Sequence, residues 1–328
     1  MTWFDALTGF PERSGDDVRA KLRLDGTQLT SIANNRTFNA GRFSTPSLSQ
    51  LRSRTQTVAG RQLRVAEVVG DVRSLHQDVA NANAVFQVAS QFNCLEMAAP
   101  DVIPEDGVGI YQDDWTQGPA CSICAGAGTI FRNYFAEVNG KTGQTRDNQI
   151  DCLSDIGRHF GGDPWRMENG YCLPTTASLA DIEAQLSSCS EKALDDLRGK
   201  LKVGVQSKTQ VTMDDATHLV TQVFCSALPV SYSDIPASKW DYFPRLILDA
   251  TYESTFHVAV QNLADTGSRK LYLTLVGGGV FGNELDWILS SIGRSLKLFS
   301  WADLDVSIVS HGASKPDVVR FLAHQNAE

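Results

Sequence analysis

The sequence contains no basic cluster and no long apolar run. The formal net charge is −9 and lysines and arginines are scattered, which excludes a surface that coats nucleic acid. No apolar run reaches the roughly 20 residues of a bilayer-spanning helix, which argues against a membrane protein. The first residues, MTWFD, lack the basic and apolar regions of a signal peptide. We therefore expect a cytoplasmic protein with no nucleic-acid and no membrane partner.

The spacings that mark metal and cofactor sites are also missing. No histidine pair has metal-ligand spacing, and the seven cysteines are odd in number, as in a protein with reduced thiols. Cys121 and Cys124 form a CxxC pair at an expected helix start, which is also found at redox and zinc sites. Cys152 and Cys172 do not supply a second pair with this spacing. We interpret these cysteines as small buried residues and predict no metal and no cofactor.

What the sequence does contain is typical of a globular domain. Hydrophobic residues make up 42% and charged residues 20% of 328 residues, enough for a sizeable core. Residues 1–58 are rich in Ser, Thr, Arg and Asn, and we expect an N-terminal extension of short helices packed on the core. Thr45-Pro46 resembles a helix start. Residues 59–328 would form the main domain.

Strands and helices alternate after residue 62. Strands are expected at 63–69, 84–89, 217–228, 270–276 and 305–310, and helices at 243–263 and 285–296. Residues 137–215 are less regular and are interpreted as an insertion, with an amphipathic helix at 178–201. The alternation predicts an α/β fold, a three-layer α/β/α sandwich with a mostly parallel central mixed sheet. Ligands of such folds bind outside the carboxyl ends of the strands.

Two segments rich in glycine are candidates for anion binding. Residues 118–134, GPACSICAGAGTIFRNY, read as a loop that turns into a helix, and a helix start with small residues admits a phosphate. Residues 277–283, GGGVFGN, directly follow an expected strand. They lack the Gly-Lys-Ser/Thr of a P-loop and the spacing of a dinucleotide fingerprint. Three consecutive glycines favour a nest of backbone N–H groups around a phosphate.

In this order the motifs resemble the macrodomain family over residues 62–312. Gly70-Asp71-Val72 and Asn93 resemble the macrodomain opening, and the two glycine-rich segments resemble its two phosphate loops. The TQGPAC and GGGVFGN segments look most like the MavL-type ADP-ribosyl hydrolases, a branch between macrodomains and poly(ADP-ribose) glycohydrolases. The resemblance implies a macrodomain-like fold that binds ADP-ribose.

The resemblance also implies roles for individual residues. Asp71 would contact the adenine amino group, Asn93 the distal ribose, and the two loops the diphosphate. The implied ligand-binding residues are Asp71, Gln91, Phe92, Asn93, Thr116, Gln117, Gly118, Pro119, Ala120, Gly277, Gly278, Gly279, Val280, Phe281, Gly282 and Asn283. The segment SQFN keeps only the last Asn of the family's Asn-Ala-Ala-Asn motif, and the first loop has Gly-Pro instead of a glycine run. These departures favour the branch in which acidic residues near the first loop do the chemistry.

Acidic residues before the first loop are the candidates for catalysis. Hydrolysis at the anomeric carbon of ribose passes through an oxocarbenium-like state, which a carboxylate stabilises. From the residues alone, Asp113 and Asp114 fit solvated loop acids or a helix cap at least as well. The resemblance favours catalysis, with Asp114 ahead of Asp113 and with Asp106 assisting. Glu105 and Glu96 are secondary candidates.

The predicted function is therefore that of an ADP-ribosyl hydrolase. It would bind ADP-ribose, free or protein-linked, and cleave an N- or O-glycosidic ADP-ribosyl bond of a modified protein. The MavL-type resemblance suggests an arginine-linked substrate, with ADP-ribosylated ubiquitin as one candidate. The alternative is a reader module that binds ADP-ribose without turnover through the same loops. A third interpretation is an α/β protein with an unrelated phosphorylated ligand.

Overall fold

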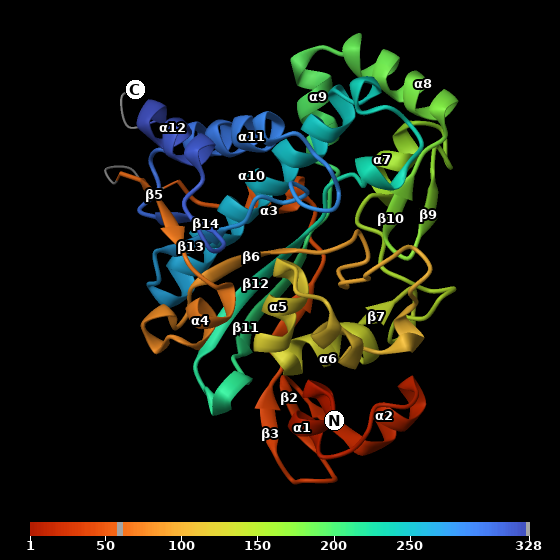
Figure 1. Ribbon diagram of the computed structural model, residues 1–328, viewed down its shortest axis with the longest axis vertical. Coiled ribbons are helices and arrows are strands. Elements are labelled where there is room, and N and C mark those ends of the chain that lie inside the picture. The colour runs from red at the N-terminus through yellow and green to blue at the C-terminus, as the bar shows by residue number, and fades with distance from the viewer. Residues whose placement is uncertain (58–61, 326–328) are drawn as a thin grey trace.

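A computed structural model describes residues 1–57 and 62–325, and its centre is a seven-stranded sheet (Figure 1). The strand order is β4-β11-β12-β6-β13-β14-β5. Five neighbouring strands, from β12 to β5, are parallel, whereas β11 pairs antiparallel with both β12 and the edge strand β4. The bounds are β4 (Arg42–Ser44), β5 (Arg64–Val69), β6 (Val85–Ala89), β11 (Gly204–Gln210), β12 (Leu219–Cys225), β13 (Lys270–Leu273) and β14 (Asp305–Ser310). The predicted mostly parallel mixed sheet is confirmed.

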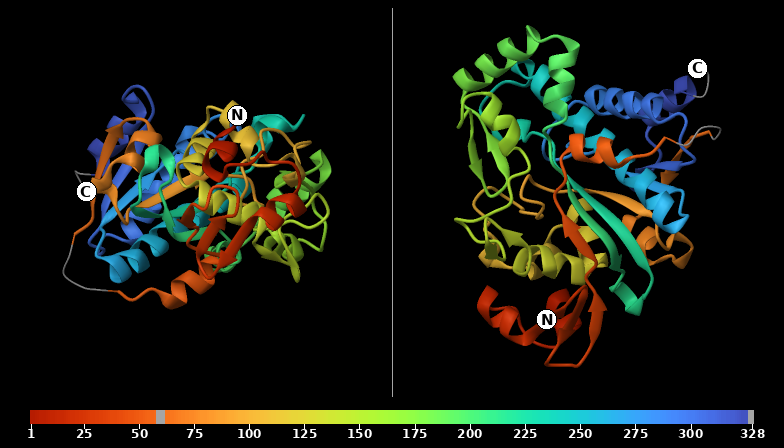
Figure 2. Two further views of the ribbon diagram at one scale, coloured as in Figure 1. Left: turned by 90° about the horizontal axis from the view of Figure 1, so that it is seen from below. Right: turned by 180° about the vertical axis from the view of Figure 1, so that it is seen from behind.

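Helices cover both faces of this sheet (Figures 1 and 2). One layer consists of α4 (Val72–Gln77), α5 (Gln117–Cys124) and α6 (Gly126–Tyr134). The other consists of α3 (Leu48–Arg54), α10 (Tyr242–Thr266) and α11 (Leu285–Leu298), and α12 (Pro316–Gln325) packs against α11 and β5. The helix α10 is buried along most of its length because the sheet and the helices α3 and α11 surround it. The predicted three-layer α/β/α sandwich is thus confirmed.

The central strand β6 illustrates how the sequence specifies this sheet. Val85, Phe86 and Val88 are almost completely buried, as expected for a parallel strand that is covered on both faces. The buried amide of Gln87 is satisfied, since its Nε2 donates to Thr255 Oγ1 (3.0 Å) and its Oε1 accepts from Thr274 N (3.2 Å). These two hydrogen bonds hold the strand in place. The pocket described below begins at the carboxyl end of this strand.

The N-terminal extension contains strands that the sequence analysis did not predict. Helices α1 (Trp3–Thr8) and α2 (Gly15–Lys21) precede a three-stranded sheet of β1 (Leu22–Asp25), β2 (Gln28–Ser31) and β3 (Thr37–Asn39). These elements share a second hydrophobic core with η3 (Gly109–Asp113) and α6, and β4 then pairs with β11 in the main sheet. The extension packs as part of the domain. The prediction of helices alone was incomplete, because short strands with weak alternation leave little local signal in the sequence.

Two predicted helix boundaries also change. Helix α3 begins after Ser47, not at Pro46, because the Ser47 hydroxyl accepts the Gln50 N–H and forms a capping box. The helix expected at 178–201 is two helices, α8 (Thr176–Ser187) and α9 (Glu191–Arg198), because Ser190 caps a new N-terminus.

The insertion is also shorter than predicted, since β11 belongs to the main sheet. The other elements of the insertion are β7 (Glu137–Val138), β8 (Lys141–Thr142), α7 (Ser154–His159), β9 (Arg166–Glu168) and β10 (Tyr171–Leu173). In Figure 1 its helices α8 and α9 lie far from α1 and α2 of the N-terminal extension. One strand of this insertion, β10, contributes a side chain to the pocket.

An ion-pair cluster ties four helices together on the α10 side. Glu253 of α10 accepts from Arg52 Nε of α3 and from Arg294 Nη1 of α11, both at 2.6 Å. Arg52 also binds Asp195 of α9 through two N–H groups (2.9 and 2.7 Å). Burial by itself would raise the pKa of Glu253, but hydrogen bonds from His257, Arg52 and Arg294 hold that pKa well below its ordinary value. The ionised carboxylate is therefore a source of stability.

We expect Glu253→Gln to lower the free energy of unfolding by about 2 kcal/mol at pH 7, because both arginines lose their common partner. A carboxyl whose folded pKa is depressed stabilises the fold above its unfolded pKa, near 4.5, and this contribution is lost as the pH falls toward the folded pKa. The gap between wild type and variant should thus narrow below about pH 4.5. Urea unfolding at pH 7 and pH 3 measures both values, with Glu191→Gln, an exposed acid paired to Arg198, as control. Equal stability at pH 7 would contradict this assignment.

Candidate active site

A pocket lies at the carboxyl ends of β6, β12 and β13, the edge where a parallel sheet places ligands. Its cavity volume is about 160 Å³, smaller than the roughly 300–1,000 Å³ typical of small-molecule sites, and its mouth is open to solvent. The lining residues are Ala89, Ser90, Gln91, Glu96, Met97, Ala98, Asp114, Thr116, Gln117, Gly118, Pro119, Tyr171, Ala227, Tyr232, Thr274, Leu275, Val276, Gly277, Gly279, Val280 and Phe281. Both predicted phosphate loops are therefore in one pocket.

The first wall is the N-terminus of α5. The expected loop at Gly118-Pro119 is in fact the first turn of this helix, which begins at Gln117. The Gln117 side chain docks it on β6, donating to Gln87 O (2.9 Å) and accepting from Ala89 N (2.9 Å). A Cβ at position 118 would lie 2.0 Å from Ala89 O, so only glycine allows this approach. A first helical turn leaves its backbone N–H groups without intrahelical partners, here at Gln117 and Gly118.

The opposite wall is the second glycine-rich loop. Gly277 and Gly282 adopt left-handed φ angles of 78° and 71°, which favour glycine. Asn283 anchors the loop, because its Nδ2 donates to Leu228 O (2.8 Å). The backbone N–H groups of residues 279–281 have no hydrogen-bond partner among the residues that the structure describes. Unpaired N–H groups on both walls can bind the oxygens of a diphosphate.

The floor of the pocket is a tight loop that carries Glu96. Gln91 closes this loop with its amide, since Nε2 donates to Met97 O (2.9 Å) and Oε1 accepts from Met97 N (2.7 Å). Asn93 Oδ1 accepts from Leu95 N (3.0 Å), and Cys94 has a φ of 61°. These bonds turn the chain back on itself directly after β6. As a result Glu96 lines the pocket instead of continuing the strand direction.

Glu96 is a buried carboxyl group with an unusual environment. Arg132 Nη2 lies 3.5 Å from Glu96 Oε2, and neither carboxyl oxygen has a hydrogen-bond partner within the described part of the chain. Burial raises the pKa of Glu96 to about 7, although the neighbouring Arg132 charge works in the opposite direction. A carboxyl that titrates near neutral pH can both hold and release a proton during a reaction.

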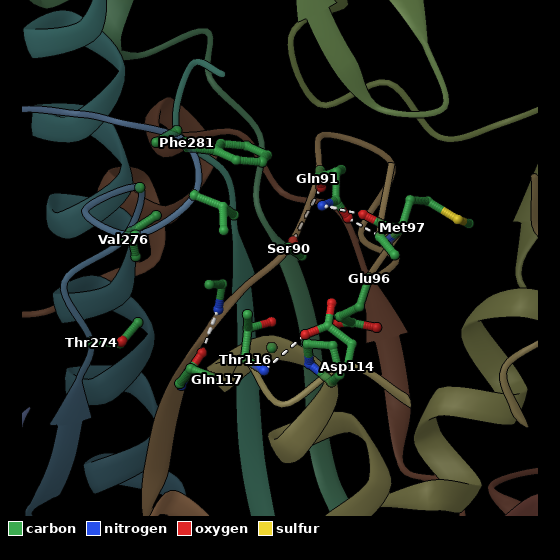
Figure 3. Close-up of a pocket in the computed structure, with 18 of the residues that line it drawn as sticks. Ser90, Gln91, Glu96, Met97, Asp114, Thr116, Gln117, Thr274, Val276 and Phe281 are labelled. Carbon is green, nitrogen blue, oxygen red and sulfur yellow. Dashed lines mark hydrogen bonds between the residues drawn. The ribbon is translucent and has the colours of Figure 1, made fainter. Parts of the chain in front are cut away.

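Asp114 lines the same pocket as Glu96. In Figure 3 both side chains lie across the pocket from Val276 and Phe281. The Asp114 Oδ1 accepts from Thr116 N (2.8 Å), which fixes the carboxylate just before α5. Two carboxyl groups in different environments, one buried and one half-buried, are an arrangement that glycoside-cleaving enzymes use.

Three aromatic rings form the remaining side of the pocket. Tyr171 of β10, Tyr232 of η5 (Val230–Tyr232) and Phe281 of the second loop contact one another, with centroid separations of 5.0 to 5.5 Å. The Tyr171 hydroxyl donates to Met97 O (2.6 Å) and links the insertion to the Glu96 loop. Neither tyrosine was predicted as a site residue, because no local motif marks it. Flat aromatic surfaces of this kind suit a nucleobase or a sugar face.

The predicted site residues divide into two groups. Asp114, Gln91, Thr116, Gln117, Gly118, Pro119, Gly277, Gly279, Val280 and Phe281 line the pocket. Asp113, Asp106, Asp71, Phe92, Asn93, Ala120, Gly278, Gly282 and Asn283 do not. Residues of the second group support the site or lie outside it.

The positions of this second group have identifiable causes. Asp113 is exposed, and Asp106 is exposed and accepts from Ile103 N (2.9 Å) in a short helical turn. Asp71 caps α4 by accepting from Arg73 N (2.8 Å) at the end of β5, two strands away from β13. Phe92 is in the hydrophobic core, and Asn93 Nδ2 donates to Gln149 Oε1 (2.8 Å). Their predicted contacts with a ligand stay predictions.

The CxxC pair has the surroundings of structural cysteines. Both thiols are buried in the core, and burial raises the pKa of Cys124 to about 12 and that of Cys121 well above its ordinary value. Such thiols are poor nucleophiles and poor metal ligands. Among the described residues, no group of three or more His, Cys, Asp or Glu side chains could hold a metal ion. No helix in the same ranges has the length and apolar character of a membrane span.

Comparison with known proteins gives matches to solved structures only. No family model matches the chain, and no curated protein matches it. Poly(ADP-ribose) glycohydrolase from Thermomonospora curvata, bound to the inhibitor ADP-HPD, is 12% identical, with 96% of this chain and 97% of that chain covered and a TM-score of 0.46. The enzyme from Deinococcus radiodurans, in complex with ADP-ribose, is 12% identical over 87% and 93%, with a TM-score of 0.43. A likeness at this level does not assign an activity to this chain.

Proposed function

We propose that this protein is an ADP-ribosyl hydrolase that binds ADP-ribose and cleaves its glycosidic bond to a modified protein. The observation that carries the proposal is the position of Glu96 and Asp114 in a pocket whose opposite walls carry backbone N–H groups that have no partner in residues 1–57 and 62–325. The N–H groups suit a diphosphate, the aromatic rings suit a base or ribose, and the carboxyl pair suits glycosidic chemistry. The macrodomain-like motifs of the sequence point to the same ligand.

In the proposed reaction Glu96 is the general acid. Its protonated carboxyl donates a proton to the leaving group as the bond from the anomeric carbon to the acceptor breaks. The Asp114 carboxylate stabilises the positive charge that develops on the ribose and accepts a proton from the attacking water. The new bond joins the water oxygen to the anomeric carbon, so the products are ADP-ribose and the unmodified acceptor.

The acceptor and the cellular location are finer parts of this proposal. An arginine-linked substrate, with ADP-ribosylated ubiquitin as one candidate, rests on the MavL-type resemblance of the sequence. A cytoplasmic location rests on the thiols, since all seven cysteines are free of disulfides.

The first experiment separates a hydrolase from a reader. We expect wild type to bind ADP-ribose and to release it from a mono-ADP-ribosylated arginine peptide, while Asp114→Asn lowers kcat about 100-fold. The dissociation constant for ADP-ribose, measured by calorimetry, should change by less than about threefold, because Asp114 acts on the developing charge. Asp113→Asn, one residue away but exposed, should keep wild-type turnover. Binding without product release in wild type would identify a reader, and absence of binding would reject the ADP-ribose site.

A further inference from the structure

Glu12, in the N-terminal extension, binds the loop that leads to Asp114. Its carboxylate accepts from the backbone N–H groups of Val108 (2.9 Å) and Gly109 (2.6 Å) and from the Tyr134 hydroxyl (2.5 Å). This contact joins two distant parts of the sequence, since Glu12 and Val108 are 96 residues apart. Three donors to one partly buried carboxylate form a strong, geometrically defined contact.

Two glycines of this loop leave space for the carboxylate. A Cβ at position 107 would lie 2.6 Å from Glu12 Oε2, and one at position 109 would lie 2.8 Å from the same oxygen. Gly107 also has a φ of 87°, whereas Gly109 is in an ordinary backbone conformation. At Gly109, then, the close approach of Glu12 is the reason that glycine fits. The absence of side chains at these two positions therefore leaves room for the Glu12 carboxylate of the N-terminal extension.

The loop held by Glu12 supports both carboxyl groups of the pocket. It continues as η3, in which the Tyr111 hydroxyl accepts from Glu96 N (3.2 Å) and the Tyr111 carbonyl accepts from Asp114 N (3.2 Å). Tyr111 is buried in the second core together with the helix α1. Trp3 adds a further bond, from its Nε1 to Val108 O (3.0 Å). Figure 1 shows α1 and α2 next to α6, at the end of the molecule where these contacts occur.

We propose that Glu12 is a positioning residue, which holds the loop of residues 107–114 so that Tyr111 and Asp114 are in place for catalysis. The N-terminal extension then serves the active site and is more than a cover for the domain. This inference rests on the proposed hydrolase activity for its catalytic part. Its structural part, the ordering of the loop by Glu12, can be measured without any substrate.

The test uses two variants of the full chain that break the contact from opposite sides. Glu12→Ala removes the acceptor, and Gly109→Ala leaves Glu12 intact but places a methyl group only 2.8 Å from its Oε2. Both should speed amide hydrogen exchange in residues 107–114 and lower kcat about tenfold, with ADP-ribose affinity within about threefold. In the double variant the two effects should not add, because both remove the same contact. Asp16→Ala, an exposed acid of the same extension, is the matched control and should change none of these values.

The outcomes distinguish this inference from the proposed function. Unchanged amide hydrogen exchange in residues 107–114 would overturn the positioning role. Faster exchange together with a wild-type kcat would overturn it as well. A parallel loss of ADP-ribose affinity and of overall folding would show a merely structural role, and would overturn it as well. If wild type lacks hydrolase activity but both variants speed amide exchange in the loop, the proposed function is wrong, whereas the ordering of the loop by Glu12 is confirmed. If Glu12→Ala does not fold, Gly109→Ala decides the question alone.

Discussion

Replacing Glu96 with glutamine should lower kcat about 1,000-fold, within the range that loss of a positioned general acid produces. Glutamine has nearly the same shape but cannot release a proton to the leaving group. Affinity for ADP-ribose should stay within about threefold of wild type, because Glu96 acts on the bond that breaks and not on the diphosphate. Single-turnover release of ADP-ribose from a modified arginine peptide measures kcat, and calorimetry measures the affinity.

The pH dependence makes this assignment specific. The Glu96 carboxyl has a pKa of about 7, raised mainly by burial, so its acid form is present below pH 7 and is lost above it. The rate of a reaction that needs the acid form should therefore halve near pH 7 and fall about tenfold for each further pH unit. In Glu96→Gln this alkaline decrease should disappear. A decrease on the acidic side of pH 7 would instead identify Glu96 as a general base.

Stability gives the control for the same variant. Below pH 7 the wild-type carboxyl is already neutral, so glutamine adds no change in charge beside Arg132. We expect the two melting temperatures at pH 6 to agree within about 2 °C. As the pH rises from 4.5 to 7, the unfolded chain loses this proton before the folded chain does, so stability from this group decreases with pH. A variant that unfolds at pH 6 would remove the basis for interpreting its lost activity.

The five parallel strands of the central sheet could be predicted because their signals are local, whereas β4 and β11 were not predicted. The strand β14 was predicted with the observed bounds, and β6 and β13 within a few residues, since buried parallel strands appear as short apolar runs between loops. Parallel strands place their carboxyl ends together, which is why both glycine-rich segments were expected in one site and were found there. Local pattern and strand direction together were sufficient for this part.

The rest of the site depends on contacts between distant segments. Tyr171 reaches the pocket from the insertion, and Glu12 reaches the active-site loop from the extension, yet neither belongs to a motif. The sequence alone could not distinguish Asp113 from Asp114, because the difference arises from the folded loop, in which Thr116 N donates to the Asp114 side chain. The raised pKa of Glu96 arises from burial, which no spacing of residues reveals. Such features follow from the packed fold and not from the neighbouring sequence.

The second large effect is expected at Gly279, where glutamate should weaken ADP-ribose binding at least about 100-fold. A Cβ at this position meets no atom within 4 Å, so a side chain can be added without disturbing the fold. The same residue lines the pocket, and the new carboxylate would lie beside the bound diphosphate. Two like charges roughly 5 Å apart at an effective dielectric constant near 20 repel by about 3 kcal/mol, which corresponds to about 100-fold in affinity. Calorimetric titration with ADP-ribose measures the loss.

Three further variants separate charge, size and position. Gly279→Ala should bind like wild type, and Gly279→Gln, which is as large as glutamate but neutral, should lose less than Gly279→Glu. Lower salt should widen the difference between the last two, because the repulsion is electrostatic. The neighbouring Gly278 is unsuitable for this purpose, since its Cβ would start 3.0 Å from Ile288 Cδ1 and test packing instead of the pocket. If Gly279→Glu binds ADP-ribose as tightly as wild type, the diphosphate does not lie along this loop, and the unpaired N–H groups of residues 279–281 serve another ligand.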